Sequence, residues 1–176
     1  MNYQKIYSFD LANGPGVRVS LFVSGCSLHC PGCFNQEAWD FCSGKPFTEE
    51  HMNAIKEILN DEKYAGLSIL GGEPFDQDKK GLKQLIKLCK YAHKQNKTVW
   101  IWTGHLISEL ESKHQKRLLK YCDVVVEGPY KKELKTFDTP FIGSSNQKII
   151  SVDKNKNIWY NIIKGVKKLD GFWKND

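Results

Sequence analysis

The stretch VRVSLFVSGCSLHCPGCFN, residues 17–35, joins an apolar run to a loop that carries three of the chain's six cysteines. The run at 17–23 is rich in valine, leucine and phenylalanine, so it predicts a buried β-strand that leads directly into the loop. Cys26, Cys30 and Cys33 lie within eight positions. Three thiols are one short of the four ligands that a structural zinc site or a fully ligated iron–sulfur cluster takes. The fourth ligand is the question that this loop raises.

Strands and helices alternate through most of the chain. The predicted strands are 17–25, 66–72, 97–104, 123–130 and 146–152, and the predicted helices are 48–61, 77–95 and 105–121. This repetition gives parallel strands joined by right-handed crossovers. A full eight-fold barrel takes ~250 residues, and this chain has 176. We therefore expect an α/β fold, a partial and open (β/α) barrel with mostly parallel strands.

Glycine and polar residues follow four of the predicted strands. After the cysteine loop come three further sets, which are Gly71, Gly72, Glu73 and Pro74, then Thr103, Gly104 and His105, then Glu127, Gly128 and Pro129. The carboxyl ends of parallel strands share one edge of a sheet, and chemistry gathers there. The sequence therefore predicts that four loops converge on one mouth.

Soft thiolates select zinc or an iron–sulfur cluster. A closed zinc site would need His29 or Cys42 as its fourth ligand, and His29 is an awkward choice because it adjoins Cys30. A [4Fe–4S] cluster held by three cysteines leaves one iron open for a substrate or cofactor. Glycines around the thiols suit a cluster, because they let the backbone approach it closely. A chance grouping of cysteines without metal is the remaining alternative.

The cysteine spacing, C-x3-C-x2-C after the first strand, resembles that of the radical S-adenosylmethionine enzymes. LGGEP at 70–74 resembles the glycine-rich motif of that superfamily. A narrower resemblance is carried by NGPGVRVSLFVSGC, CPGCFNQEAW, GGEP, VWIWTG and FIGSSNQ, in this order. Together these motifs are similar to the activating components of anaerobic (class III) ribonucleotide reductases. The superfamily often has an aromatic residue before the third cysteine, whereas here Gly32 holds that position and Phe34 follows, as in the activases.

The resemblance implies a barrel of radical S-adenosylmethionine type, with a [4Fe–4S] cluster on Cys26, Cys30 and Cys33. The open iron would bind S-adenosylmethionine, which is then the missing fourth ligand. The same resemblance implies that the cofactor contacts Gly32, Cys33, Phe34, Gly71, Gly72 and Glu73. No catalytic residue beyond the cluster and the cofactor is implied.

The implied reaction is that of a glycyl-radical-activating oxidoreductase. An external one-electron donor reduces the cluster, S-adenosylmethionine is cleaved, and the resulting radical takes hydrogen from a glycine loop in the large catalytic subunit of the reductase. An exposed radical needs cover, so we expect an apolar contact surface near the cysteine loop, with Phe34, Trp39 and Phe41 as candidates. The alternative for these three residues is a hydrophobic cover over the end of the barrel. Two alternatives stay open, which are an activase of another glycyl-radical enzyme and a non-enzymatic metal-binding module for nucleic acid.

Composition favours a globular cytoplasmic protein. No apolar run approaches the ~18 residues of a membrane helix, and the amino terminus does not resemble a signal peptide. The net charge of +6 is concentrated late in the chain, and without an arginine cluster it favours a solvated surface over nucleic-acid binding. Cys89 and Cys122 are predicted core residues. We divide the chain into a radical S-adenosylmethionine domain, 1–152, and a lysine-rich extension, 153–176.

Two residues near the motifs have ambiguous patterns. Arg18, in the first strand, is expected either to line the mouth or to pair with an acidic residue. His105, at the start of a predicted helix, is expected at the surface.

Overall fold

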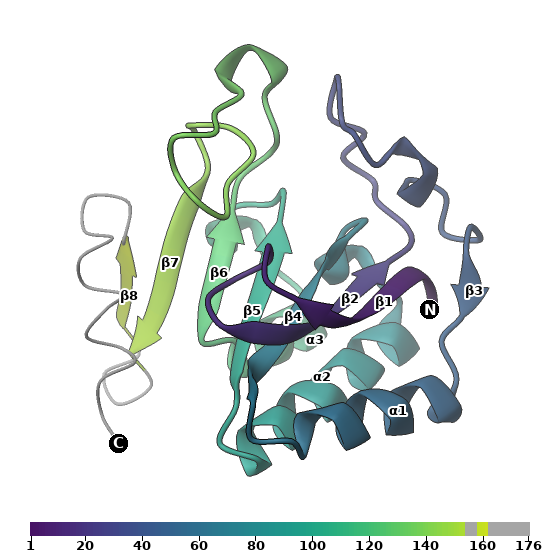
Figure 1. The fold of residues 1–176 in the computed structure, drawn as a ribbon. Coiled ribbons are helices and arrows are strands. Elements are labelled where there is room, and N and C mark those ends of the chain that lie inside the picture. Colours follow the sequence, from purple (N-terminus) through teal and green to yellow (C-terminus); the bar gives the residue numbers. More distant parts are fainter. Residues whose placement is uncertain (154–157, 162–176) are drawn as a thin grey trace.

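A computed structural model describes residues 1–153 and 158–161 of the chain (Figure 1). Its eight strands form one sheet in the order β3-β1-β2-β4-β5-β6-β7-β8. The strands are β1 Asn2–Asp10, β2 Val17–Val23, β3 Lys45–Pro46, β4 Tyr64–Gly71, β5 Thr98–Thr103, β6 Val124–Glu127, β7 Lys148–Asp153 and β8 Ile158–Asn161. The helices are α1 Glu49–Leu59, α2 Lys79–Lys94 and α3 Lys113–Leu119, with short 3-10 turns η1 Gln36–Ala38, η2 Pro74–Asp76, η3 Ile107–Glu109 and η4 Lys132–Leu134.

The four central strands run parallel. β2, β4, β5 and β6 pair side by side in one direction, and α1, α2 and α3 connect them successively. All three helices cover the same face of the sheet (Figure 1). One-sided cover of this kind is the consequence of crossovers that share one hand. The expected α/β class and the open sheet are thus confirmed.

Antiparallel strands flank the parallel centre on both sides. β1 pairs with β2 and β3, while β7 pairs with β6 and β8. The strand β1 was not predicted, because its sequence NYQKIYSFD mixes polar and apolar residues without a clean alternation. The division at residue 152 stays a prediction, since β7 runs through Asp153 and most of the proposed extension lies outside the described residues.

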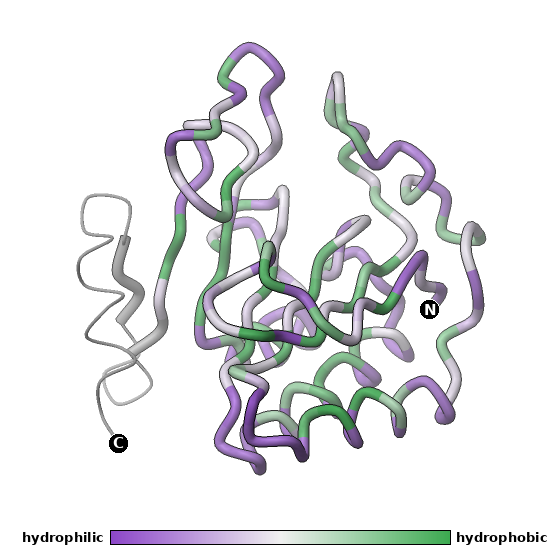
Figure 2. The backbone as a smooth tube through the Cα atoms, viewed as in Figure 1, coloured by the Kyte–Doolittle hydropathy of each residue, from purple (hydrophilic) through white to green (hydrophobic). Residues whose placement is uncertain are grey.

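The main core lies between the sheet and the helices. It is built from the strand residues that face the helices and from the apolar stripes of α1 and α2, including Cys89 and Cys122, which confirms both cysteines as core residues. A smaller cluster of Trp100, Val124, Val126 and Ile149 lies apart from the main core, with Trp102 and Phe141 against it. Figure 2 shows hydrophobic colour along the central strands and hydrophilic colour on outer turns.

The helix predicted at 105–121 is wrong in its first half. The structure has the turn η3 and then the shorter α3, which starts after Ser112. Two side chains explain the break. Glu127 accepts a hydrogen bond from the backbone N–H of Ile107 at 2.8 Å, and Ser112 caps α3 by accepting one from Gln115 N at 3.1 Å. The distant carboxylate holds the backbone at Ile107 outside an α-helix, and the local cap at Ser112 starts a new one.

Candidate functional site

The cysteine loop leaves the carboxyl end of β2 and places its three cysteines on one cavity. Cys26, Cys30 and Cys33 are free thiols of intermediate exposure, and all three line a cavity of about 160 Å³. Burial raises the pKa of the Cys26 thiol, while the backbone N–H groups of Leu28 and His29 lower it. Donors directed at a sulfur are the environment in which a metal-bound thiolate is stabilised.

The thiols suit a cluster better than a single ion. Within the described residues, no group of three or more histidine, cysteine, aspartate or glutamate side chains is placed to hold one metal ion. Zinc draws its ligands to one centre, whereas the cysteines of a [4Fe–4S] cluster bind separate irons and stand further apart. Cys33 Sγ also accepts a hydrogen bond from Asn35 N at 3.4 Å. The donor set therefore fits a cluster.

The rest of the lining comes from the cysteine segment itself and from the three loops that the sequence singled out. It consists of Leu28, Phe34 and Trp39 after β2, Leu70, Gly71, Gly72 and Glu73 at the end of β4, Trp102, Thr103 and Gly104 at the end of β5, and Gly128, Tyr130 and Gln147 beyond β6. The loops after β2 and β6 project from the same end of the sheet (Figure 1). The predicted convergence of four loops is what the structure has, and the role of each residue stays a prediction.

Gly32 is the one predicted cofactor residue that does not line the cavity. Its φ is +74°, and a Cβ there would lie 2.8 Å from Cδ of Lys132. Lys132 belongs to η4, so Gly32 lets the loop after β6 pack against the outside of the cysteine loop. Spacing in the sequence contains no signal for this contact.

The GGEP turn lies directly against the cysteine loop. Gly72 N donates to Val23 O and Glu73 N donates to Gly25 O, both at 2.7 Å. A Cβ on Gly72 would lie 2.5 Å from Gly25 O and 3.0 Å from Ala38 O, and these are backbone atoms that cannot rotate away. The missing side chain is therefore needed for the close approach of the two loops.

Replacing Gly72 with alanine should separate the two loops and weaken the metal site. We expect the variant to lose stability by about 1–3 kcal/mol, the usual cost of overpacking, and to retain less iron after anaerobic reconstitution. Iron analysis and urea unfolding measure both effects. Gly143→Ala is the matched control, since a Cβ there comes no closer than 3.3 Å to another residue. Equal iron content in both variants would contradict this account.

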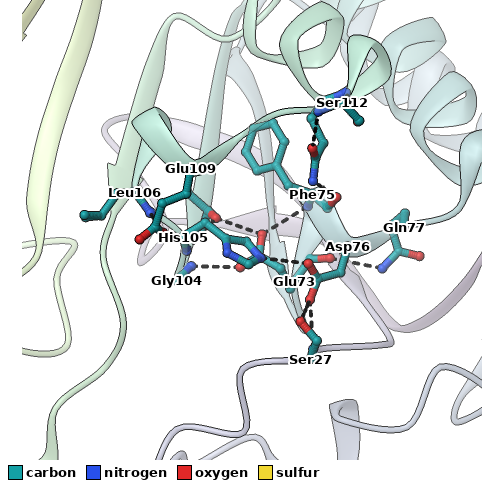
Figure 3. A network of polar contacts seen from close by, with 12 residues as sticks. Ser27, Glu73, Phe75, Asp76, Gln77, Gly104, His105, Leu106, Glu109 and Ser112 are labelled. Carbon is teal, nitrogen blue, oxygen red and sulfur yellow. Dashed lines mark hydrogen bonds and ion pairs between the residues drawn. The ribbon is translucent and has the colours of Figure 1, made fainter.

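Glu73 is buried and joins two of the loops (Figure 3). Its Oε1 accepts hydrogen bonds from Phe75 N at 3.0 Å and from the Thr103 hydroxyl at 2.8 Å, and its Oε2 accepts one from Gly104 N at 2.8 Å. Burial raises the pKa of Glu73 to about 7, although the hydrogen bonds and His105 oppose the rise. The sequence did not predict these partners, and contact with a cofactor ammonium stays a prediction.

Glu73 should make stability depend on pH in the metal-free chain. The folded state holds the proton to about pH 7, while the unfolded carboxyl releases it near 4.5. The free energy of unfolding should therefore fall as pH rises through this window, by about 3 kcal/mol relative to Glu73→Gln, and stay level above it. Urea unfolding of both chains at several pH values, with chelator present, measures the difference. If the free energies of unfolding of wild type and Glu73→Gln varied with pH in the same way, the raised pKa of Glu73 would be ruled out as a cause.

The GSSNQ segment, 143–147, braces the loop after β6. Gln147 accepts hydrogen bonds from Gly143 N and Ser144 N and donates one to Gly128 O at 2.9 Å. Asn146 donates to Pro129 O at 2.8 Å. Gln147 thus lines the cavity, but its side-chain amide is occupied by hydrogen bonds to the backbone of the cavity wall. The sequence motif alone does not reveal these bonds.

The structure also places four other residues that the sequence singled out. Cys42 is exposed and does not line the cavity. Arg18 is fully buried and does not line the cavity, which excludes the first of its two expected placements, at the mouth. His105 was expected at the surface but is largely buried, with its Nε2 2.7 Å from Asp76 Oδ1. Trp39, a predicted contact residue, stacks on His29 with ring centres 4.7 Å apart.

Comparison with known proteins identifies the class of protein to which this chain belongs. The family described as "4Fe-4S single cluster domain" matches residues 12–150. That span includes the three cysteines, the GGEP turn and the GSSNQ segment.

Curated relatives narrow the assignment. The anaerobic ribonucleoside-triphosphate reductase-activating protein of Enterobacteria phage T4 is 36% identical over 180 residues, which cover 100% of both chains. The proteins of the same name from Vibrio cholerae and Escherichia coli are 40% and 38% identical, covering 85% and 84% of this chain and 97% and 96% of their own. The chain therefore belongs to the family of anaerobic ribonucleoside-triphosphate reductase-activating proteins. This confirms the resemblance in the sequence.

Among the described helices, none has the length and apolarity to cross a membrane.

Proposed function

We propose that this protein is a radical S-adenosylmethionine enzyme that activates an anaerobic ribonucleotide reductase, with a [4Fe–4S] cluster on Cys26, Cys30 and Cys33. The observation that carries the proposal is the shared cavity, in which three free thiols face the GGEP turn. When bound, the reduced cluster supplies the electron that splits S-adenosylmethionine into methionine and a 5′-deoxyadenosyl radical, which takes hydrogen from a glycine of the reductase's large subunit.

The protein's own part is to bind, orient and shield. Gly71 and Gly72 present bare backbone to the cavity, and Glu73 fixes the ends of β4 and β5 relative to each other. Gly128 and Tyr130 form the wall on the side of β6. We propose that the cofactor's methionine end lies along the glycines and that Phe34 packs near its adenine. The open sheet, with helices on one face only, supports assignment as a partial barrel of the radical S-adenosylmethionine type.

The alternatives fit less well. A zinc-binding nucleic-acid module would need ligands that converge on one ion, which the described residues do not provide. An activase of a different glycyl-radical enzyme is disfavoured by the names of the three relatives given above, each of which is a reductase-activating protein. We further propose a cytoplasmic location, because Cys26, Cys30, Cys33 and Cys42 are free thiols, as in a reducing compartment.

An apolar surface beside the cavity is our candidate for contact with the reductase. Phe34 is 92% exposed, and Phe9 and Leu11 at the end of β1 are 59% and 64% exposed. These three residues line a second, wider hollow that shares Phe34 and Leu70 with the cysteine cavity. A protein that delivers a glycine to the cavity must contact its rim, and exposed apolar groups mark such contacts. The predicted candidate Phe41 is 45% exposed and lies against Gly25.

Replacing Phe9 with serine should uncouple cleavage of S-adenosylmethionine from formation of the glycyl radical on the reductase. Phe9 lines only the outer hollow, so we expect S-adenosylmethionine cleavage by the reduced protein to persist while glycyl-radical formation falls about tenfold, the loss of one buried aromatic contact. Electron paramagnetic resonance of the reductase and chromatography of 5′-deoxyadenosine measure the two yields. Phe137→Ser, at an 87% exposed residue outside both hollows, is the control. Equal radical yield from both variants would exclude this surface.

The proposed function itself is tested with the wild-type chain. After anaerobic reconstitution with iron and sulfide, dithionite serves as the electron donor, with S-adenosylmethionine and a large reductase subunit added. We expect 5′-deoxyadenosine and a glycyl radical. Tight uptake of one zinc ion with no nucleoside would overturn the proposal, and nucleoside without a radical would leave an enzyme with a different partner.

A further inference from the structure

Asp76, at the end of η2, holds the cysteine loop from outside the cavity (Figure 3). Its Oδ2 accepts two hydrogen bonds from Ser27, from the backbone N at 2.8 Å and from the hydroxyl at 2.6 Å. Its Oδ1 lies 2.7 Å from Nε2 of His105, which follows β5. One carboxylate thus connects three loops of the site. Burial acts to raise the pKa of Asp76, but hydrogen bonds from His105 and Ser27 outweigh it and leave the pKa below its ordinary value.

The order of these three residues excludes a nucleophilic use of Ser27. In a catalytic triad the histidine lies between the hydroxyl and the carboxylate, so that it can take the hydroxyl proton. Here Asp76 is in the middle, and the His105 ring bonds to Asp76. His105 itself is fixed, because its backbone N donates to the Thr103 hydroxyl at 3.1 Å. The arrangement therefore holds a loop in place and does not activate a hydroxyl.

The cysteine loop has few other polar attachments. Between Ser27 and Gly32, the two bonds from Ser27 to Asp76 are the only hydrogen bonds to another element among those of the described residues. On either side, Cys26 N donates to Trp39 O at 3.1 Å and Cys33 N donates to Cys30 O at 3.0 Å. The hydrogen bonds that attach the segment between the first two thiols to another element thus all go to a single side chain from η2.

We propose that Asp76, oriented by His105, is a positioning residue that sets the separation of Cys26 and Cys30 for the cluster. The inference rests on the proposed function, since it concerns the same metal group. Groups that fix metal ligands without touching the metal typically change metal affinity 10–100-fold when they are replaced. The pair is distinct from the proposed cofactor contacts, because neither Asp76 nor His105 lines the cavity.

The test compares cluster retention in the reconstituted holoprotein. Asp76→Asn keeps the shape, but its single oxygen cannot accept from both Ser27 and His105. Ser27→Ala removes only the hydroxyl bond to Asp76, and Ser27 is exposed. This variant therefore tests the proposal even if Asp76→Asn folds poorly. His93→Gln is the matched control, because His93 forms the other described histidine–aspartate pair, 2.8 Å from Asp123 on the helix-covered side.

We expect the rate of cluster loss to a chelator to rise at least about tenfold in Asp76→Asn and by a smaller factor in Ser27→Ala. The electron paramagnetic resonance signal of the reduced cluster should also change, which a general loss of stability would not cause. His93→Gln should behave as wild type. Wild-type rates and spectra in both site variants would overturn the inference while the proposed function stands. A wild-type chain that forms no [4Fe–4S] cluster would overturn both.

Discussion

Cys30→Ala should abolish cleavage of S-adenosylmethionine by the reduced, reconstituted protein, with a loss of 5′-deoxyadenosine of at least about 100-fold. Cys30 is one of three thiols on the cavity, and no cysteine outside the loop lines it. A cluster left with two cysteines has no further thiolate to hold it. Even groups that act on ligands indirectly cost 10–100-fold, so loss of a ligand itself should cost more. Chromatography of the nucleoside and analysis of iron and sulfide measure the effect.

Cys42→Ala is the matched control for this experiment. Cys42 lies close behind the loop in sequence, but its side chain is exposed and does not line the cavity. Its replacement should leave iron content and nucleoside yield within about twofold of wild type, as expected for a surface substitution away from any special feature. Equal losses in both variants would show that Cys42 is needed as much as Cys30 and would contradict the assigned ligands.

Arg18→Ala should produce the largest loss of stability of any single substitution considered, about 3–5 kcal/mol in the free energy of unfolding. The guanidinium is fully buried and makes five hydrogen bonds, to Ser68 Oγ at 2.7 Å, Leu67 O at 2.8 Å, Thr98 O and Oγ1 at 3.1 Å and Pro15 O at 3.4 Å. Burial lowers its pKa to about 9, so it stays charged at neutral pH. Truncation would leave both a large cavity and unpaired acceptors.

Two variants check the cause of this loss. Arg18→Lys keeps the charge but cannot reproduce the planar fork of five donors, so it should recover only part of the stability. Arg117→Ala removes the chain's other arginine, which is exposed on α3, and should cost less than about 0.5 kcal/mol. Urea unfolding of the metal-free chains gives all three values. A loss below about 1 kcal/mol for Arg18→Ala would refute the role assigned to its hydrogen bonds.

Much of the site was predictable because its residues carry local signals. Cys26, Cys30 and Cys33 follow an unmistakable strand, and the GGEP turn follows another, so the rule for parallel sheets places them at one edge. The positions of Cys89 and Cys122 followed from their apolar surroundings. These predictions needed only periodicity and strand direction, which short stretches of sequence contain.

The errors came from contacts between distant residues. Helix 105–121 failed because Glu127, twenty residues away, bonds to Ile107. His105 was assigned to the surface because its partner Asp76 lies 29 residues earlier. The placement of Arg18 was left open between two alternatives, because its acceptors belong to β4, β5 and the preceding turn. The strand β1 escaped notice because it pairs with β2 over a poorly alternating sequence. A window of local sequence cannot contain such information.

The two bonds from Gly72 and Glu73 to Val23 and Gly25 continue the β2–β4 ladder past the strand ends. The start of the cysteine loop is therefore part of the same cooperative unit as the centre of the sheet, and it opens only when that centre opens. The entropic cost of ordering this part of the loop is met during folding of the chain. The metal group then binds a loop that is already partly ordered, and this preorganisation raises its affinity without any additional contact.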